Sequence, residues 1–235
     1  METKTIKILN LYAGIGGNRK LWGGDIKVVA VEINPKIAKI YQDFFPQDKV
    51  IVTDAHQFLL EHFKEFDFIW SSPPCPSHSR IRFLKQNQNA KPKFPDMELY
   101  GEIIFLMTWF DGKFCIENVK SYYEPLIKPQ ESGNHYFWTN FRIGKLEKRK
   151  RGIVHMKHKD SVIYHQKYLG FDLSNLNESQ SFKEQILNNC VEPELGLHIF
   201  KLAFKEPQLT LTELNQKNIS SPKHKGMGIR NGRVI

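Results

Sequence analysis

The sequence predicts an α/β fold in which short apolar strands alternate with amphipathic helices. Helical apolar spacing lies between successive strand-like runs, and each run stops at glycine, proline or an acidic residue. Strands and helices that alternate in this way form open, mostly parallel sheets. The expected strands are 6–11, 28–31, 50–53, 66–70, 113–119 and 136–143, and the expected helices are 35–45, 55–63, 100–107 and 193–204.

The first strand runs into Ala13-Gly14-Ile15-Gly16-Gly17, a glycine-rich turn before a helix. Glycines at such a turn allow a ligand to approach the backbone. Their spacing resembles a dinucleotide fingerprint, but Arg19 takes the place of the third glycine. The pattern therefore indicates a ligand site without favouring NAD.

Two acidic residues follow the next strands. Glu32 ends the second strand, where its carboxylate can accept hydrogen bonds from both hydroxyls of a ribose. Asp54 follows the third strand, caps the next helix and could contact a ligand's exocyclic amine. Because parallel strands end at one edge of a sheet, we expect these carboxylates to share a site.

The fourth strand stops abruptly at Ser-Ser-Pro-Pro and presents Cys75. Proline on both sides fixes φ, so the thiol sits on a stiff turn at a strand end, a setting that suits a nucleophile. The alternative, a buried structural cysteine, fits poorly beside three prolines and two serines. The polar stretch 77–95 is a long loop, interpreted as a functional lid or as plain disorder.

The strand 113–119 carries Glu117 near its end, followed by an amide, a pattern more typical of a catalytic acid than of a surface residue. Cys115 on the same strand is expected in the core. Three cysteines without a C-x-x-C pair argue against a disulfide framework or zinc site and for a reducing compartment, the cytoplasm. The histidines at 155, 158 and 165 have no cysteine or acidic residue at the spacing of metal ligands, so no metal is expected.

The 235 residues suffice for one domain, and the sequence contains neither a signal-peptide pattern nor eighteen consecutive apolar residues. The net charge of +9 is unevenly distributed: 142–168 holds nine Lys or Arg against two acids, and five more basic residues follow Glu213 without any acid. Such segregation indicates a polyanion, most often nucleic acid. A solvated basic loop is the alternative.

Six segments, in order, resemble motifs of the cytosine-5 DNA methyltransferases. LYAGIGG is similar to the first motif, with Tyr12 in place of the usual phenylalanine. VEINP resembles the second, Asp54-Ala55 the third, SSPPCPS the fourth, IENV the sixth and NNCVEPELG the tenth. The resemblance implies a Rossmann-like, S-adenosylmethionine-dependent methyltransferase sheet with a small inserted basic recognition segment.

In that family a thiolate adds to carbon 6 of cytosine so that carbon 5 can attack a methyl donor. The resemblance assigns the thiolate to Cys75 and the carboxyl group at ring nitrogen 3 to Glu117. It implies a catalytic core over 1–141, a recognition segment over 142–185, a returning helix over 186–205 and a basic tail over 206–235.

The resemblance also implies the binding residues. Those expected at S-adenosylmethionine are Tyr12, Ala13, Gly14, Gly16, Gly17, Glu32, Ile33, Asp54, Ala55, Pro73, Asn189 and Val191. Those expected at double-stranded DNA are Ser79, Arg80, Arg82, Lys148, Arg149, Lys150 and Arg151. We expect a monomer in the cytoplasm of a bacterial or phage-infected cell, with a cognate restriction nuclease as a partner by association and no membrane partner.

The chain departs from the family where the eighth motif usually carries arginines, since it has Asn134 and His135 there instead. Either these two side chains supply the missing hydrogen bonds, an arginine from elsewhere does so, or the enzyme is impaired; we favour the first and count His135 as catalytic. Two other functions stay open: an RNA cytosine methyltransferase, and a DNA-binding protein on a decayed methyltransferase scaffold.

Overall fold

The computed structural model describes residues 5–80, 93–144, 146 and 158–205. The chain divides into two units, Met1–Phe204 and Lys205–Ile235, and the first contains every helix and strand described below. None of the described helices is both long and apolar enough to cross a membrane.

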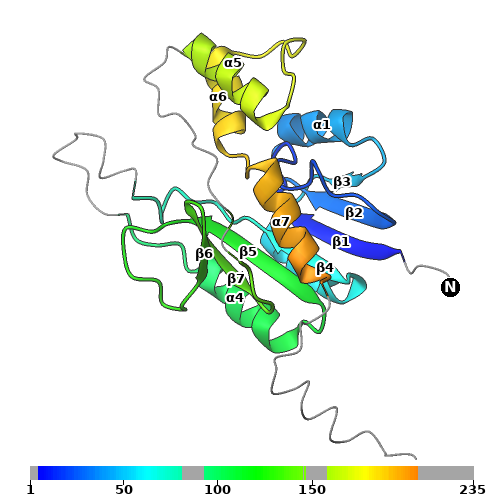
Figure 1. The fold of residues 1–235 in the computed structure, drawn as a ribbon, viewed down its shortest axis with the longest axis vertical. Helices are drawn as coiled ribbons and strands as arrows, with labels where there is room; N and C mark the ends of the chain where they lie inside the picture. Colours follow the sequence, from blue (N-terminus) through cyan, green and yellow to red (C-terminus); the bar gives the residue numbers. More distant parts are fainter. Residues whose placement is uncertain (1–4, 81–92, 145, 147–157, 206–235) are drawn as a thin grey trace, which may run out of the picture. The chain divides into compact units, whose positions relative to one another are not determined.

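A mixed sheet of seven described strands forms the centre of the first unit (Figure 1). Its order is β3-β2-β1-β4-β5-β7-β6, and β1 to β5 pair in parallel while β7 runs antiparallel to β5 and to β6. The strands are β1 (Ile6–Leu11), β2 (Ile26–Val31), β3 (Lys49–Ile51), β4 (Phe68–Ser71), β5 (Lys113–Val119), β6 (Gln130–Ser132) and β7 (His135–Thr139). The α/β class predicted from the sequence is confirmed.

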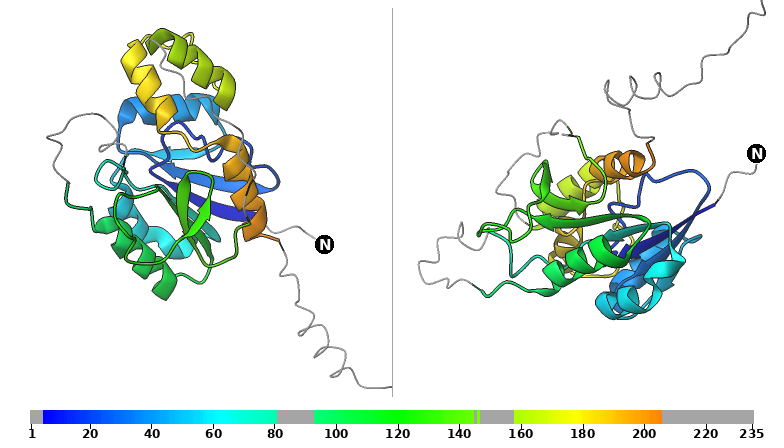
Figure 2. Two further views of the ribbon diagram at one scale, coloured as in Figure 1. Left: turned by 60° about the vertical axis from the view of Figure 1, so that its left-hand side comes forward. Right: turned by 90° about the horizontal axis from the view of Figure 1, so that it is seen from below.

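Helices cover both faces of the sheet (Figure 2). They are α1 (Pro35–Phe44), α2 (Ala55–His62), α4 (Glu98–Trp109), α5 (His158–Leu169), α6 (Gln180–Asn188) and α7 (Pro193–Ala203), with a short 3-10 turn over Phe63–Glu65. Start signals in the sequence account for several of them. Pro35 and Pro193 lie in first turns, and Asn34 and Asp54 cap α1 and α2 by accepting backbone N–H bonds.

Side chains of successive strand residues alternate between two cores. Leu9 of β1 packs in a cluster with Leu59 of α2 and Ile103 of α4. Its neighbour Ile8 faces the other side of the sheet, in a cluster with Ile199 of α7 and the fully buried Cys115 of β5. The core position expected for Cys115 is therefore confirmed.

The helices α5 and α6 pack with α1 in a third cluster, in which Val162 and Leu187 lie with Ile40. The sequence did not predict either helix, or the three-residue strand β6. The residue at which we divided the recognition segment from the returning helix, 185, lies inside α6. The last strand is also shorter than predicted, since the side chain of Asn140 accepts a hydrogen bond from the N–H of Phe114 just beyond its end.

Candidate active site

The residues singled out by sequence lie at the carboxyl ends of the parallel strands. Tyr12 follows β1, Glu32 follows β2, Asp54 follows β3 and Cys75 follows β4. The strand order reverses beside β1: β2 and β3 are added on one side of it, and β4 and β5 are then added on the other. Open α/β sheets bind their ligands at such a point.

Glu32 is held in place by backbone donors. One carboxylate oxygen accepts the N–H of Gly14 at 3.0 Å and the other accepts the N–H of Asn34 at 2.9 Å. Glu32 is only 8% exposed. Each oxygen keeps further lone-pair capacity, so the carboxylate can still accept hydrogen bonds from a diol.

The turn after β1 needs glycine for two different reasons. A Cβ at Gly14 would meet nothing within 4 Å, whereas one at Gly16 would lie 2.3 Å from the Phe45 ring and one at Gly17 only 2.4 Å from the Val191 carbonyl oxygen. Gly14 and Gly16 also have positive φ. At Gly16 and Gly17, packing within the chain fills the space that a Cβ would occupy, so packing requires glycine there, and the roles of both residues at a cofactor stay predictions.

Arg19, which stands where a dinucleotide fingerprint has its third glycine, makes two hydrogen bonds to the Asp48 carboxylate at 2.9 and 3.0 Å. Asp48 also accepts the hydroxyl of Tyr41 at 2.8 Å. Such a paired, part-buried guanidinium has a structural role. It ties the turn after β1 to the end of α1.

The tenth-motif segment returns beside the first-motif turn. Val191 is buried against Gly17, and a Cβ at Gly196 would lie 2.4 Å from the Asn18 carbonyl oxygen. Asn189, the C-cap of α6, is exposed. The proximity that the resemblance implied is present in the structure, while the roles of Asn189 and Val191 at a cofactor stay predictions.

Three further predicted residues differ in exposure. Ile33 is 65% exposed although it is apolar, and Asp54 is exposed while one of its oxygens caps α2 by accepting the Gln57 N–H at 2.8 Å. Ala55, by contrast, is buried at the start of α2. An exposed apolar side chain directly after Glu32 offers a surface for a flat, polar-edged ring.

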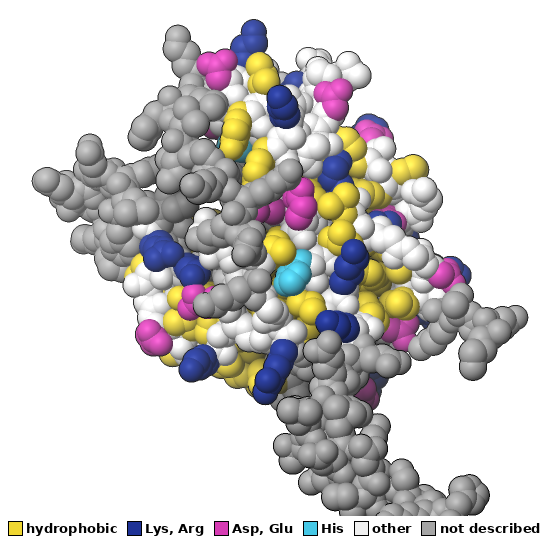
Figure 3. All heavy atoms as spheres, viewed as in Figure 1, with side chains coloured by type: hydrophobic (Ala, Val, Ile, Leu, Met, Phe, Trp, Pro, Cys, Tyr) yellow, Lys and Arg dark blue, Asp and Glu magenta, His cyan; other side chains and the backbone are white. Residues whose placement is uncertain are grey.

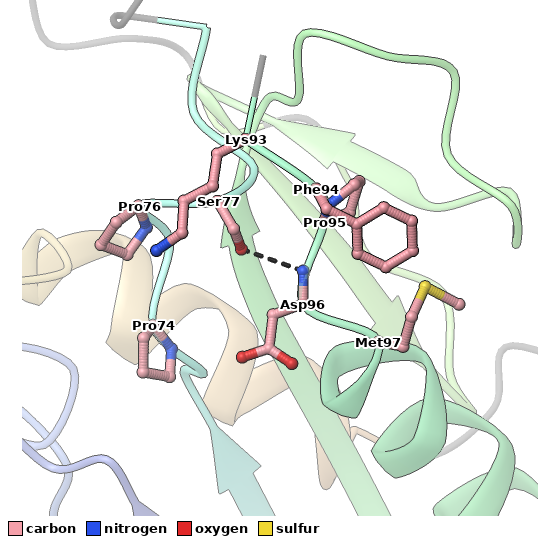
Figure 4. Close-up of a pocket in the computed structure, with 8 residues that line it drawn as sticks. All are labelled: Pro74, Pro76, Ser77, Lys93, Phe94, Pro95, Asp96 and Met97. Atoms are coloured by element: carbon pink, nitrogen blue, oxygen red, sulfur yellow. Dashed lines mark hydrogen bonds between the residues drawn. The ribbon is translucent and has the colours of Figure 1, made fainter. Parts of the chain in front are cut away.

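Cys75 is half-buried on a tight turn after β4. Its carbonyl oxygen accepts the N–H groups of His78 and Ser79, both at 3.0 Å. Beside the turn is a cavity of about 480 Å³, whose walls are the turn residues and the segment before α4. Figure 4 shows these two walls facing each other, joined by a hydrogen bond of 3.1 Å from the Asp96 N–H to the Ser77 hydroxyl. Its lining residues are Pro74, Pro76, Ser77, Lys93, Phe94, Pro95, Asp96 and Met97.

The end of β5 supports the cysteine turn. Asn118 donates its side-chain N–H to the Pro73 carbonyl at 3.0 Å, and Pro73 is itself buried. The neighbouring carboxylate of Glu117, 6% exposed, accepts a hydrogen bond from Nδ1 of His135 on the paired strand β7. The structure thus brings the three predicted catalytic residues to one edge of the sheet.

The environment of Cys75 disfavours the thiolate in the protein alone. Burial raises the pKa of the Cys75 thiol, and the nearby negative charge of Glu117 raises it further. The thiol is therefore protonated at neutral pH. A nucleophile with this environment has to lose its proton when the substrate arrives.

Two residues at this site were missed from the sequence. His78 is 1% exposed, and its Nδ1 forms a hydrogen bond of 2.6 Å with the Tyr123 hydroxyl, which ties the cysteine turn to the segment after β5. Burial lowers the pKa of His78, so its ring is neutral. Glu102 of α4 is fully buried among the strand ends. A signal for Glu102 was present, since it lies on the same helical face as Leu99 and Leu106.

Few of the residues expected at DNA can be placed. Arg80 is exposed, and Ser79 pairs through a β-bridge with Ser121. Arg82 and the basic run 148–151 lie outside the described residues. On the face shown in Figure 3, the described Lys and Arg side chains are interspersed with acidic and apolar ones.

Comparison with known proteins finds similarity to cytosine-5 methyltransferases. Residues 6–129 match the model of a family described as C-5 cytosine-specific DNA methylase. The sequence is 31% identical over 132 residues to a tRNA (cytosine(38)-C(5))-methyltransferase of Spodoptera frugiperda, a match that covers 52% of this chain and 38% of that protein. A crystal structure of a Spodoptera frugiperda DNMT2 mutant aligns with a TM-score of 0.58 at 15% identity, over 85% of this chain and 100% of that one.

Proposed function

Because the chain belongs to the C-5 cytosine-specific DNA methylase family, we propose that it methylates carbon 5 of cytosine in duplex DNA through a covalent adduct on Cys75. Membership of the family implies S-adenosylmethionine as the cofactor. The observation that carries the proposal is the meeting of Cys75, Glu117 and His135 at the sheet edge that also carries Glu32 and Asp54.

The residues at this edge fit the cofactor. The Glu32 carboxylate, oriented by two backbone N–H groups, suits the two ribose hydroxyls, and the exposed Ile33 suits one face of the adenine. Asp54 would accept the adenine amine, and the open space beside Gly14 would receive the methionine end. When bound, the cofactor supplies an electrophilic methyl group.

The protein's own residues perform the rest of the chemistry. As Cys75 Sγ bonds to carbon 6 of cytosine, the thiol proton passes to the nearby Glu117 carboxylate, and the ring electrons shift toward nitrogen 3 and carbon 5. Glu117, now protonated, donates its proton to nitrogen 3, where negative charge develops, while His135 holds the carboxyl group in position. After methylation a solvent water accepts the C5 proton, and the C5–C6 double bond re-forms as the Sγ–C6 bond breaks. Cys75 departs as a thiolate and regains the nitrogen 3 proton by way of Glu117.

The target base has to leave the duplex to reach Cys75, at a cost of a few kcal/mol. Lys148, Arg149, Lys150 and Arg151 would then contact phosphates rather than bases, and we place DNA binding in this basic segment on charge alone. The contacts of the described residues do not indicate a recognition sequence or a partner nuclease.

A second candidate substrate is tRNA. It is favoured by the 31% identity to a tRNA cytosine-5 methyltransferase. That match spans 38% of the relative, and the chemistry of the cysteine turn is the same for either nucleic acid.

Matched substrates separate the two candidates. Purified wild-type protein would be incubated with radiolabelled S-adenosylmethionine and either duplex DNA or tRNA transcripts, with the Cys75→Ala variant as control. We expect Cys75-dependent label in duplex DNA. Label confined to tRNA would replace the DNA proposal with the RNA one, and bisulfite sequencing of a methylation-free host expressing the chain would identify the methylated cytosines.

A further inference from the structure

A buried carboxylate joins the ends of three elements at the site. Glu102 of α4 is 0% exposed. It accepts hydrogen bonds from the Tyr12 hydroxyl at 2.7 Å, from the Ser71 hydroxyl at 2.7 Å and from Nδ1 of His56 at 3.2 Å. Burying a carboxylate without partners costs several kcal/mol, so this one persists because both oxygens are bonded.

Each donor stands next to a residue proposed for function. Tyr12 opens the turn after β1 and holds φ at 52°, a conformation that residues other than glycine adopt only when their surroundings enforce it. His56 follows Asp54 and Ala55 in the first turn of α2. Ser71 is the last residue of β4, directly before the stiff turn that carries Cys75.

The bond from Tyr12 depends on this chain's departure from the first motif. Where the family usually has phenylalanine, the ring here carries a hydroxyl, and that hydroxyl is what Glu102 accepts. Burial and the Glu102 charge both raise the pKa of Tyr12, so the hydroxyl stays protonated and donates.

We propose that Glu102 is a positioning residue that fixes the turn after β1, the start of α2 and the end of β4 relative to one another. It acts on S-adenosylmethionine through Tyr12 and His56, and on Cys75 through Ser71. The effect on Cys75 rests on the proposed function. The effect on S-adenosylmethionine binding can be measured without methyl transfer.

Removing the negative charge alone should loosen this arrangement. The Glu102→Gln variant keeps the size of the side chain but turns an amide N–H toward one of the hydroxyl donors. Thr108→Ala is the matched control, because Thr108 lies in the same helix and its hydroxyl donates to the Ile104 carbonyl, one turn earlier, at 2.7 Å. By calorimetry we expect about tenfold weaker binding of S-adenosylmethionine by Glu102→Gln and unchanged binding by Thr108→Ala.

If Glu102→Gln folds poorly, a milder variant still tests the positioning role of Glu102. Tyr12→Phe deletes one oxygen and restores the family's usual residue. It should weaken S-adenosylmethionine binding severalfold in the wild-type background and have no further effect in the Glu102→Gln background. Equal effects in both backgrounds would show that Tyr12 acts independently of Glu102.

The pKa of His56 gives a second readout, because a general loss of packing would not change it in the same way as the loss of the Glu102 charge. Its hydrogen bond to Glu102 is the main cause that raises the pKa of His56; Glu98 and Asp54 raise it too, and burial lowers it. The NMR midpoint of His56, measured without ligand, should fall in Glu102→Gln and stay unchanged in Thr108→Ala. Wild-type affinity for S-adenosylmethionine should weaken as pH rises through that midpoint, because deprotonation weakens the bond to Glu102.

The outcomes distinguish this inference from the proposed function. Wild-type affinity in both folded variants, or an unmoved His56 midpoint in Glu102→Gln, would overturn it. If the wild type binds S-adenosylmethionine with the expected dependence on Glu102 but methylates no nucleic acid, the positioning role stands and the proposed reaction fails.

Discussion

The two halves of the candidate site are built in different ways. On the cofactor side, the carboxylates of Glu32 and Asp54 are oriented by backbone N–H groups, at Gly14, Asn34 and Gln57. On the side proposed for the cytosine base, the supporting bonds are made by side chains, from His135 to Glu117 and from Asn118 to the Pro73 carbonyl. The orientation of the cofactor side therefore depends on backbone geometry, whereas the base side depends on the identity of particular side chains.

This difference predicts that the two halves can be damaged separately. Changes on the base side should abolish or slow methyl transfer while leaving S-adenosylmethionine binding intact. Changes on the cofactor side should weaken binding without altering the environment of Cys75.

The largest effect is expected from Cys75→Ala. Without the thiol no bond to carbon 6 can form, so methyl transfer should fall below detection, while calorimetry should give S-adenosylmethionine affinity within about twofold of wild type. Transfer that persists in this variant would exclude the covalent mechanism.

Glu32→Ala removes the acceptor for Gly14, Asn34 and the proposed ribose contact. Hydrogen bonds to a charged group contribute about 1.5–3 kcal/mol, so we expect S-adenosylmethionine to bind about 10- to 100-fold more weakly. Asp43→Ala is the control, since Asp43 is an exposed carboxylate of α1 that pairs with Lys39. Equal loss in both variants would count against a specific role for Glu32.

His135→Ala tests whether Glu117 needs the support of the His135 ring. Glu117 would remain but lose the ring that holds it, so single-turnover methylation should slow by about 10- to 100-fold while cofactor binding stays unchanged. An undiminished rate would show that His135 does not replace the arginines of the eighth motif.

The smallest effect concerns the acidity of Cys75. Because Glu117 raises the pKa of the thiol, Glu117→Gln should lower that pKa and increase the thiolate fraction at a given pH. Alkylation of Cys75 by iodoacetamide at pH 8 should then be about two- to threefold faster, modest because burial is the larger cause. Slower alkylation would contradict the sign of this electrostatic effect.

Sequence patterns predicted the strand ends that carry Glu32 and Asp54 for a physical reason. Strand ends, helix caps and positive-φ glycines are properties of a few adjacent residues, so Glu32, Asp54 and the turn at Gly14 could be read from the chain. The bond between Glu117 and His135 depends on the pairing of β5 with β7, which the sequence does not encode locally.

The same limit explains what was missed. The helices α5 and α6 have few apolar residues, and those become meaningful only when Val162 and Leu187 meet Ile40 of α1. Glu102 was overlooked although it shares a helical face with Leu99 and Leu106, because a helical pattern does not show the hydrogen-bond donors from three other segments that stabilise a buried acid.

Covalent trapping tests the central claim most directly. A duplex containing 5-fluorocytosine would be incubated with wild-type protein and S-adenosylmethionine, and the product digested for mass spectrometry. Because fluorine replaces the proton whose loss releases the enzyme, we predict a stable adduct between the methylated fluorinated base and the peptide that carries Cys75. Methylation of ordinary duplex DNA together with no adduct on Cys75 would contradict the proposed mechanism.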